Sequence, residues 1–297
     1  MDIALSRPLQ VPAPRPPRRF SGRRRRGAIP GFGLTLGLTL GWLGVIVLIP
    51  LAALFARSAG IGWEGFAAAA FSDRAIAAYR VSVLTALAAA GVNAVFGLLL
   101  AWVFVRYEFP GKRLFDATID LPFALPTAVA GIALTTLYAQ SGWIGRLTDP
   151  LHIHIAFTQA GIVVAMAFVG SPFVVRTVQP VLEDLDYAME EAARSLGASP
   201  WQTFVRVLFP TCVPALLTGT ALAFARAAGE YGSVIFIAGN MPMKTEIAAL
   251  LIVTRLEEYD YEGAAAIALA MLVFSLSIML AINLLQNRME RREDKRA

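Results

Sequence analysis

The chain has little charge and few of the residues that build disulfides, metal sites or catalytic centres. Only 16% of its 297 residues are charged, whereas soluble globular proteins carry about 25%. A single cysteine, Cys212, excludes an internal disulfide and a cysteine metal cluster. The only two histidines, His152 and His154, do not make a metal site by themselves. These scarcities argue against an ordinary soluble enzyme.

A nucleotide-binding loop is also missing. A P-loop needs a glycine five residues before Gly-Lys-Ser/Thr. Neither "PGKR" at 110–113 nor "MKT" at 243–245 has that pattern. We therefore expect this chain to bind no ATP by that route, to need no cofactor and to catalyse no reaction.

Apolar residues are abundant instead, at 57% of the chain, and the mean hydropathy is +0.62. A helix needs about twenty apolar residues to cross a bilayer. Segment 230–262 is interrupted by Gly239, Asn240, Pro242 and Lys244, so we expect it to stay on the outer side and be partly re-entrant. The sequence predicts an all-α integral membrane protein with six transmembrane helices, at about 32–56, 81–105, 117–139, 158–179, 207–229 and 263–286.

The distribution of basic residues predicts the orientation of these helices. Residues 1–30 are rich in proline and arginine and should be disordered or lie on anionic lipid headgroups. With both termini in the cytoplasm, 19 of the 26 lysines and arginines fall on the cytoplasmic side, as the positive-inside rule requires. The net charge of +5 therefore reflects membrane topology, and we expect no nucleic-acid partner.

One polar stretch, "EEAARSLGASPWQTFVRVLFP" at 190–210, separates the fourth and fifth predicted spans. Gly197 should end a first helix, and Ser199 with Gln202 resembles a capping box that starts a second. Pro210 should mark a kinked start of the fifth span. We expect a helix–turn–helix on the cytoplasmic face, with a smooth patch formed by Ala192, Ala193 and Leu196. A generic amphipathic interfacial loop is the alternative.

The same stretch is similar to the EAA signature of ABC importer permeases. The matching positions are Glu191, Ala192, Ala193, Gly197 and Pro210, with Val207 and Phe209 in place of the commoner Ile and Leu. In that family the loop is the coupling helix that docks in a cleft of the cytoplasmic ATPase. The resemblance implies a type I ABC importer permease fold in a bacterial inner (cytoplasmic) membrane.

Two further segments resemble the T-type permease subunit of sulfate/thiosulfate importers. They are "GEYGSVIFIAGNMPMKTEIAALLIVTRLEEYDYEGA" at 229–264 and "DLPFALPTAVAGIALTTLYA" at 120–139. The resemblance implies three partners: a dimer of ABC ATPases, a paralogous permease, and a periplasmic sulfate/thiosulfate-binding protein. It divides the chain into a basic N-terminus (1–30), a first helix and outer loop (31–78), a permease core (79–285) with coupling helices at 182–206, and a basic tail (286–297).

Charged residues inside spans are costly and are usually paired or functional. Arg226 and Glu230 lie four residues apart and can form an intrahelical ion pair or contribute to the anion path. Backbone N–H groups at broken helices can replace the water around a dianion, and Gly229, Gly232 and Asn240 mark such breaks. For Asp120, we expect a cap or a helix–helix hydrogen bond rather than substrate contact.

Three other functions stay open on the sequence. Molybdate and tungstate permeases carry a related glycine-acid-aromatic-glycine turn. A stand-alone ion-coupled anion carrier would need acid–base pairs deep in several spans, and only Arg226–Glu230 is suggestive. A membrane receptor or scaffold is disfavoured because no segment forms a soluble sensory domain.

Overall fold

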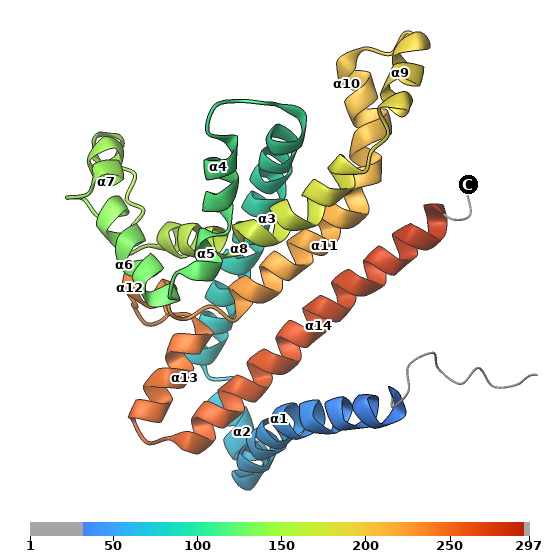
Figure 1. Ribbon diagram of the computed structural model, residues 1–297. Coiled ribbons are helices and arrows are strands. Elements are labelled where there is room, and N and C mark those ends of the chain that lie inside the picture. Colours follow the sequence, from blue (N-terminus) through green and yellow to red (C-terminus); the bar gives the residue numbers. More distant parts are fainter. Residues whose placement is uncertain (1–31, 294–297) are drawn as a thin grey trace, which may run out of the picture. The chain divides into compact units, whose positions relative to one another are not determined.

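The computed structural model describes residues 32–293, with side chains through Leu284, and these residues form helices and no strand (Figure 1). Residues 1–30, predicted to be disordered, lie outside the described residues. The helices are α1 (Phe32–Gly60), α2 (Gly62–Ala70), α3 (Asp73–Arg106), α4 (Lys112–Ile119), α5 (Leu121–Ala124), α6 (Thr127–Tyr138), α7 (Trp143–Thr148), a 3-10 turn (Asp149–Leu151), α8 (Gln159–Glu183), α9 (Tyr187–Ser195), α10 (Pro200–Thr203), a π-helical turn (Phe204–Leu208), α11 (Phe209–Ala228), α12 (Val234–Ile237), α13 (Ala248–Glu257) and α14 (Tyr261–Glu293).

Five stretches of helix in the described residues are long and apolar enough to cross a membrane. They are Phe32–Gly60, Asp73–Arg106, Gln159–Glu183, Pro200–Ala228 and Tyr261–Leu284. They correspond to five of the six predicted spans. The chain divides into two units after Leu51, so α1 begins in one unit and ends in the other.

The predicted third span, 117–139, is not one continuous helix. It is divided into α4, α5 and α6 by breaks at Asp120 and at Leu125–Pro126. Leu125 has an extended backbone (ψ 134°) because the residue before a proline is driven out of the helical region. The prediction of one helix across 117–139 was therefore wrong, and Pro122 and Pro126 in the sequence were the signal for the breaks.

The break at Asp120 is held by an ion-pair cluster centred on Arg176 of α8. The Arg176 guanidinium donates to both carboxylate oxygens of Asp120 at 2.9 and 2.7 Å, and to Asp116 Oδ1 at 2.7 Å. This bidentate geometry satisfies the charge and joins α4 and α5 to α8. The expectation of a helix–helix hydrogen bond at Asp120 is confirmed.

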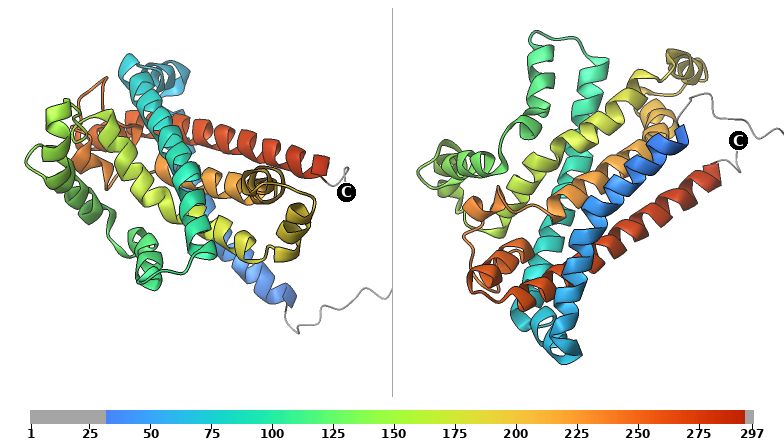
Figure 2. Two further views of the ribbon diagram at one scale, coloured as in Figure 1. Left: turned by 90° about the horizontal axis from the view of Figure 1, so that it is seen from above. Right: turned by 60° about the horizontal axis from the view of Figure 1, so that its bottom comes forward.

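Helices α3, α8 and α11 cross one another at the centre of residues 52–297 (Figures 1 and 2). Their contact depends on glycine. A Cβ at Gly97 of α3 would lie 2.7 Å from Val174 Cγ1 of α8, and a Cβ at Gly219 of α11 would lie 2.9 Å from the Val174 Cα. Small residues bring backbones close together in this way in membrane proteins, where helix association relies on van der Waals packing.

Segment 230–262 contains the short helices α12 and α13 before α14 begins at Tyr261. No helix that is long enough to span a membrane lies within it, as the sequence predicts. It is fastened to the start of α3 by two contacts. Glu246, which is 3% exposed, forms a bidentate ion pair with Arg74 at 2.9 and 2.7 Å. The Ala248 N–H donates to Ser82 Oγ at 2.8 Å. The broken segment is therefore held against a long helix by polar contacts.

The Arg176 cluster yields a stability prediction. Arg176→Gln leaves two aspartates without their cationic partner, so we expect the purified protein to lose about 1–3 kcal/mol of stability, read as a lower thermal midpoint in detergent. Arg113→Gln is the control, because Arg113 is exposed and no ion pair is found for it among the described residues. Equal midpoints for the two variants would show that the cluster does not hold α4 and α5.

Candidate functional site

The polar stretch at 190–210 folds into two short helices, and we call residues 187–208 the helical loop. Its first helix, α9, begins at Tyr187 rather than at 182 as predicted. Asp186 is the reason, because its carboxylate accepts from the Ala188 N–H at 2.9 Å and caps the helix. The preceding residue, Leu185, is buried against side chains of α8 and α11. It lies in the short non-helical segment between α8 and α9.

The end of α9 matches the sequence prediction. Gly197 has a left-handed backbone (φ +83°), which favours glycine. Its N–H donates to the Arg194 carbonyl at 2.9 Å, and the Ala198 N–H donates to the Ala193 carbonyl at 3.0 Å. These two bonds form a Schellman motif, which satisfies the last carbonyls of the helix. Gly197 therefore fixes the turn between α9 and α10.

The second helix, α10, starts with the predicted capping box. Ser199 Oγ accepts from the Gln202 N–H at 3.3 Å, and Gln202 Oε1 accepts from the Ser199 N–H at 2.9 Å. The chain then passes through the π-helical turn Phe204–Leu208 into α11, where Pro210 lies in the first turn. Proline has no N–H to donate. It is therefore tolerated in the first turn of a helix, where that N–H would have no acceptor within the helix.

The predicted smooth patch on α9 is open to solvent or to a partner. Leu196 is 89% exposed, Ala192 and Glu191 are exposed, and Ala193 is half-buried. No ion pair is found for Glu191 among the described residues. Glu191, Ala192 and Leu196 are therefore all accessible to a partner on the helical loop.

The sequence analysis missed the residue that faces inward. Glu190 is only 8% exposed, and its Oε1 lies 2.6 Å from Arg106 Nη2, at the end of α3. Adjacent residues on a helix point in directions about 100° apart, so a pair of acids such as Glu190 and Glu191 cannot share one face. That geometry, together with an arginine at the end of a predicted span, was the available signal.

The second group of predicted residues surrounds a turn at the end of α11. Arg226 and Glu230 form the expected ion pair at 2.5 Å. The other carboxylate oxygen of Glu230 accepts from the N–H of Ser233 at 2.9 Å and from its Oγ at 3.0 Å. Glu230 is 2% exposed, and both of its oxygens are occupied, so its carboxylate fastens the turn that leads into α12.

The glycines of this group differ in what they do. A Cβ at Gly232 would collide with Thr127 Oγ1 of α6, so glycine allows the turn to approach α6 closely. Gly229 has space around it and an ordinary backbone (φ −95°), and this structure gives no reason for glycine there. Asn240 has a left-handed backbone (φ 53°), and its Nδ2 donates to the Ile235 carbonyl at 2.7 Å.

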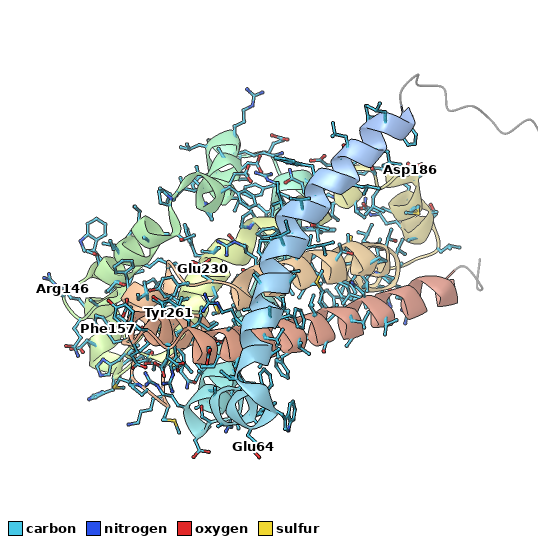
Figure 3. The ribbon with its side chains drawn as sticks, turned by 90° about the horizontal axis from the view of Figure 1, so that it is seen from below. Glu64, Arg146, Phe157, Asp186, Glu230 and Tyr261 are labelled. Atoms are coloured by element: carbon cyan, nitrogen blue, oxygen red, sulfur yellow. The ribbon has the colours of Figure 1, made fainter. Side chains whose placement is uncertain are left out.

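The two groups are far apart in the fold. Figure 3 shows Asp186, at the start of α9, at one extremity of the helices, and Glu230 in a different region among α11 and α12. The structure therefore keeps the two groups separate. Any functional connection between them has to run through the long helices.

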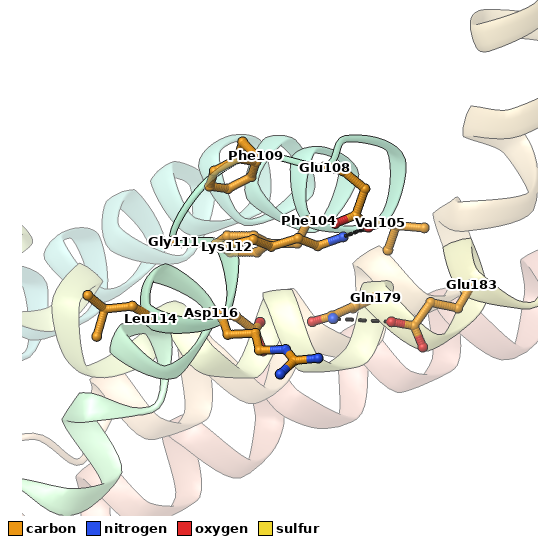
Figure 4. A pocket seen from close by; sticks show the side chains of 11 residues that line it. Phe104, Val105, Glu108, Phe109, Gly111, Lys112, Leu114, Asp116, Gln179 and Glu183 are labelled. Carbon is orange, nitrogen blue, oxygen red and sulfur yellow. Dashed lines mark hydrogen bonds and ion pairs between the residues drawn. The ribbon is translucent and has the colours of Figure 1, made fainter.

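A cavity of about 730 Å³ lies beside the end of α3 (Figure 4). Lys112 Nζ donates to Glu108 Oε1 at 2.7 Å, and Gln179 donates to Glu183 at 3.2 Å across the other wall. Acidic groups face it from several elements, among them Glu108, Asp116 and Glu183. Lys112 and Arg113 also line it, so acidic and basic groups both face this cavity.

Comparison with known proteins agrees with this fold. Residues 93–294 match the family described as "Binding-protein-dependent transport system inner membrane component". The structure resembles a subunit of a bacterial ABC transporter that imports the acidic polysaccharide alginate, with a TM-score of 0.65, 17% identity, and coverage of 88% of this chain and 96% of that one. At that identity the likeness shows the fold alone.

Relatives of closer sequence are sulfate permeases by name. The sulfate transport system permease protein CysT of Escherichia coli K12 is 49% identical over 267 residues, which cover 90% of this chain and 96% of the relative. The protein of the same name from Synechocystis is 54% identical over 249 residues, covering 84% and 87%. The chain therefore belongs to the family of inner membrane components of binding-protein-dependent transport systems, and it is a membrane translocation subunit of the ABC importer type.

Proposed function

We propose that this chain is the membrane-spanning permease subunit of an ATP-driven importer for sulfate. The observation that carries the proposal is its identity of about half to named sulfate permeases, over 84–90% of its length. Thiosulfate is a second candidate substrate, on the sequence resemblance described above. No comparison favours molybdate or tungstate.

ATP hydrolysis belongs to a separate ATPase subunit, since this sequence has no P-loop. We propose that the helical loop docks on that subunit through Glu191, Ala192, Ala193 and the protruding Leu196. Three features support this assignment: the exposed apolar side chain of Leu196, the small side chains of Ala192 and Ala193, and the turn fixed by Gly197. From the distribution of basic residues, we propose that this loop and both termini lie on the cytoplasmic side of the inner membrane.

The remaining partners follow from the family. A second, paralogous permease would complete the path, two ATPases would drive it, and a periplasmic sulfate-binding protein would deliver the anion. ATP-driven closure of the ATPases would press on the helical loops of both permeases. Because α8 and α11 flank the loop in sequence and cross in the core, such a push would rearrange the central helices.

For the path itself, we propose that the turn containing Gly229, Glu230 and Gly232 borders the route of the anion, with Asn240 in the adjoining turn. The Arg226–Glu230 pair cancels one fixed positive charge close to this turn. A dianion would then meet backbone N–H groups rather than an isolated cation that binds it too tightly. Arg226 is the pair's more open member, with 34% of its side chain exposed.

Docking through the helical loop is tested by Leu196→Asp and Glu191→Lys. Both side chains are exposed, so the permease should still insert, while the ATPase should no longer co-purify and uptake should fall at least about tenfold. Leu147→Asp is the matched control, because Leu147 of α7 is 75% exposed and lies outside the helical loop. Normal ATPase recovery and uptake with both loop variants would contradict docking at this surface.

The role of the turn that contains Gly229, Glu230 and Gly232 is tested by neutralising the Arg226–Glu230 ion pair. Arg226→Ala alone leaves the buried Glu230 carboxylate without its cationic partner. The double variant Arg226→Gln/Glu230→Gln is therefore the better probe. We expect it to insert and to retain the ATPase, but to take up sulfate about tenfold more slowly. Arg255→Gln, which removes pairs with Glu258 and Asp260 from an arginine that is similarly half-buried, is the control. Unchanged uptake in the double variant would exclude this pair from the path.

Anion preference is tested by competition in cells that carry the complete importer. Unlabelled sulfate or thiosulfate in about hundredfold excess should abolish uptake of radiolabelled sulfate, since [L] well above Kd saturates a single site. Molybdate and tungstate at the same excess should leave most of the uptake of radiolabelled sulfate intact. Stronger competition by molybdate than by sulfate would reverse the assignment.

A further inference from the structure

The last turn of α3 presents two side chains, Trp102 and Arg106, on one face of the helix. They are four residues apart, which places neighbouring side chains one above the other. The Arg106 guanidinium carbon lies 5.2 Å from the centroid of the Trp102 ring. We call these two residues the α3 anchor. Both of them contact the helical loop.

Arg106 contacts the first helix of the loop. Its Nη2 lies 2.6 Å from Glu190 Oε1, and its guanidinium carbon lies 4.9 Å from the centroid of the Tyr187 ring. The guanidinium is thus flanked by two aromatic rings and an acid, and only about a tenth of each charged side chain is exposed. Arg194 approaches the same carboxylate from solvent, at 3.7 Å.

Trp102 contacts the other arm of the loop. Its ring meets Phe204 edge-on, with centroids 5.1 Å apart and planes at 89°. Phe204 in turn stacks on Trp201 of α10 at 5.8 Å. The α3 anchor therefore fastens both arms of the helical loop, α9 through Arg106 and the π-helical turn after α10 through Trp102.

The helical geometry changes on both sides of the loop. Between α8 and α9 lies a non-helical break at Asp184–Asp186, and between α10 and α11 lies the π-helical turn, followed by Pro210. Helix breaks and π-turns allow neighbouring helices to change direction. The lateral contact with α3 therefore constrains the orientation of the loop in addition to its connections to α8 and α11.

The chemistry of the contact agrees with an orienting role. Removing two charges from water costs nearly as much as the pair regains, so a buried ion pair adds little net stability and can specify one arrangement. Here Arg106 Nε, Arg106 Nη2 and Glu190 Oε1 are buried and make no hydrogen bond of good geometry within the described residues. The two rings and the acid hold the guanidinium in place without an optimal hydrogen bond.

We propose that Trp102, Arg106 and Glu190 are positioning residues for coupling, through which a push on the helical loop passes into α3. Glu190 faces α3, while its neighbour Glu191 faces the ATPase. This proposal rests on the docking proposed above. It differs from docking in its prediction, because loss of the α3 anchor should leave the ATPase bound and break the link between hydrolysis and transport.

The test uses the complete importer in proteoliposomes with sulfate and its binding protein. In Glu190→Gln and Arg106→Gln we expect normal ATPase recovery and basal hydrolysis, but stimulation by the loaded binding protein and sulfate uptake should both fall about tenfold. The exchanged pair Arg106→Glu/Glu190→Arg should recover part of the stimulation. Arg194→Gln, which removes only the exposed partner of Glu190, is the control and should behave as wild type.

The ratio of stimulated to basal hydrolysis separates this role from a merely structural one. If the neutral variants insert poorly, Arg106→Lys decides, because it keeps the charge but loses the planar contact with both rings, and it should lower the ratio. Normal stimulation in Glu190→Gln and Arg106→Lys would overturn the α3 anchor. Loss of bound ATPase in Leu196→Asp with normal stimulation in the anchor variants would support docking alone.

Discussion

Within a bilayer no water is available to satisfy the backbone, so every break in a helix must be covered by other parts of the protein. The central crossing of α3, α8 and α11 makes this possible. Glycines 97 and 219 let their helices close on Val174, and this contact brings together the helices against which the broken segments are held. The fold is thus a tightly crossed core that supports several irregular segments.

Three of the irregular segments are secured by a charged side chain that faces an opposite charge. Arg176 holds the break at Asp120, Glu246 holds the start of segment 246–257 to α3 through Arg74, and Glu230 holds the turn after α11. In a chain with only 16% charged residues, these pairs are placed where the helices are interrupted. Apolar packing shapes the core, and ion pairs shape the interruptions.

Patterns confined to a few neighbouring residues predicted local structure well. The Gly197 turn, the Ser199–Gln202 capping box and the Arg226–Glu230 pair depend on spacing along one chain segment, and all three are confirmed. Contacts between distant segments were not predictable in this way. Helix geometry indicates that one of the two adjacent acids faces inward, but that Arg106 is the partner of Glu190 depends on where α3 ends in space. Segment 117–139 is largely apolar, and its hydropathy alone did not indicate the breaks. The helix is interrupted there because of two prolines, despite the apolar composition.

Among the three core helices, α3 alone lacks proline, while α8 contains Pro172 and Pro180 and α11 contains Pro210 and Pro214. Its 34 residues make a stiff rod of about 51 Å, pinned to Glu190 near one end and to Glu246 near the other. The close contact at Gly97 lies about 14 Å from Arg106 and about 35 Å from Arg74 along the axis. If α3 tilts about that fulcrum, a small shift at the helical loop becomes a shift roughly 2.5 times larger, in the opposite direction, at the far end.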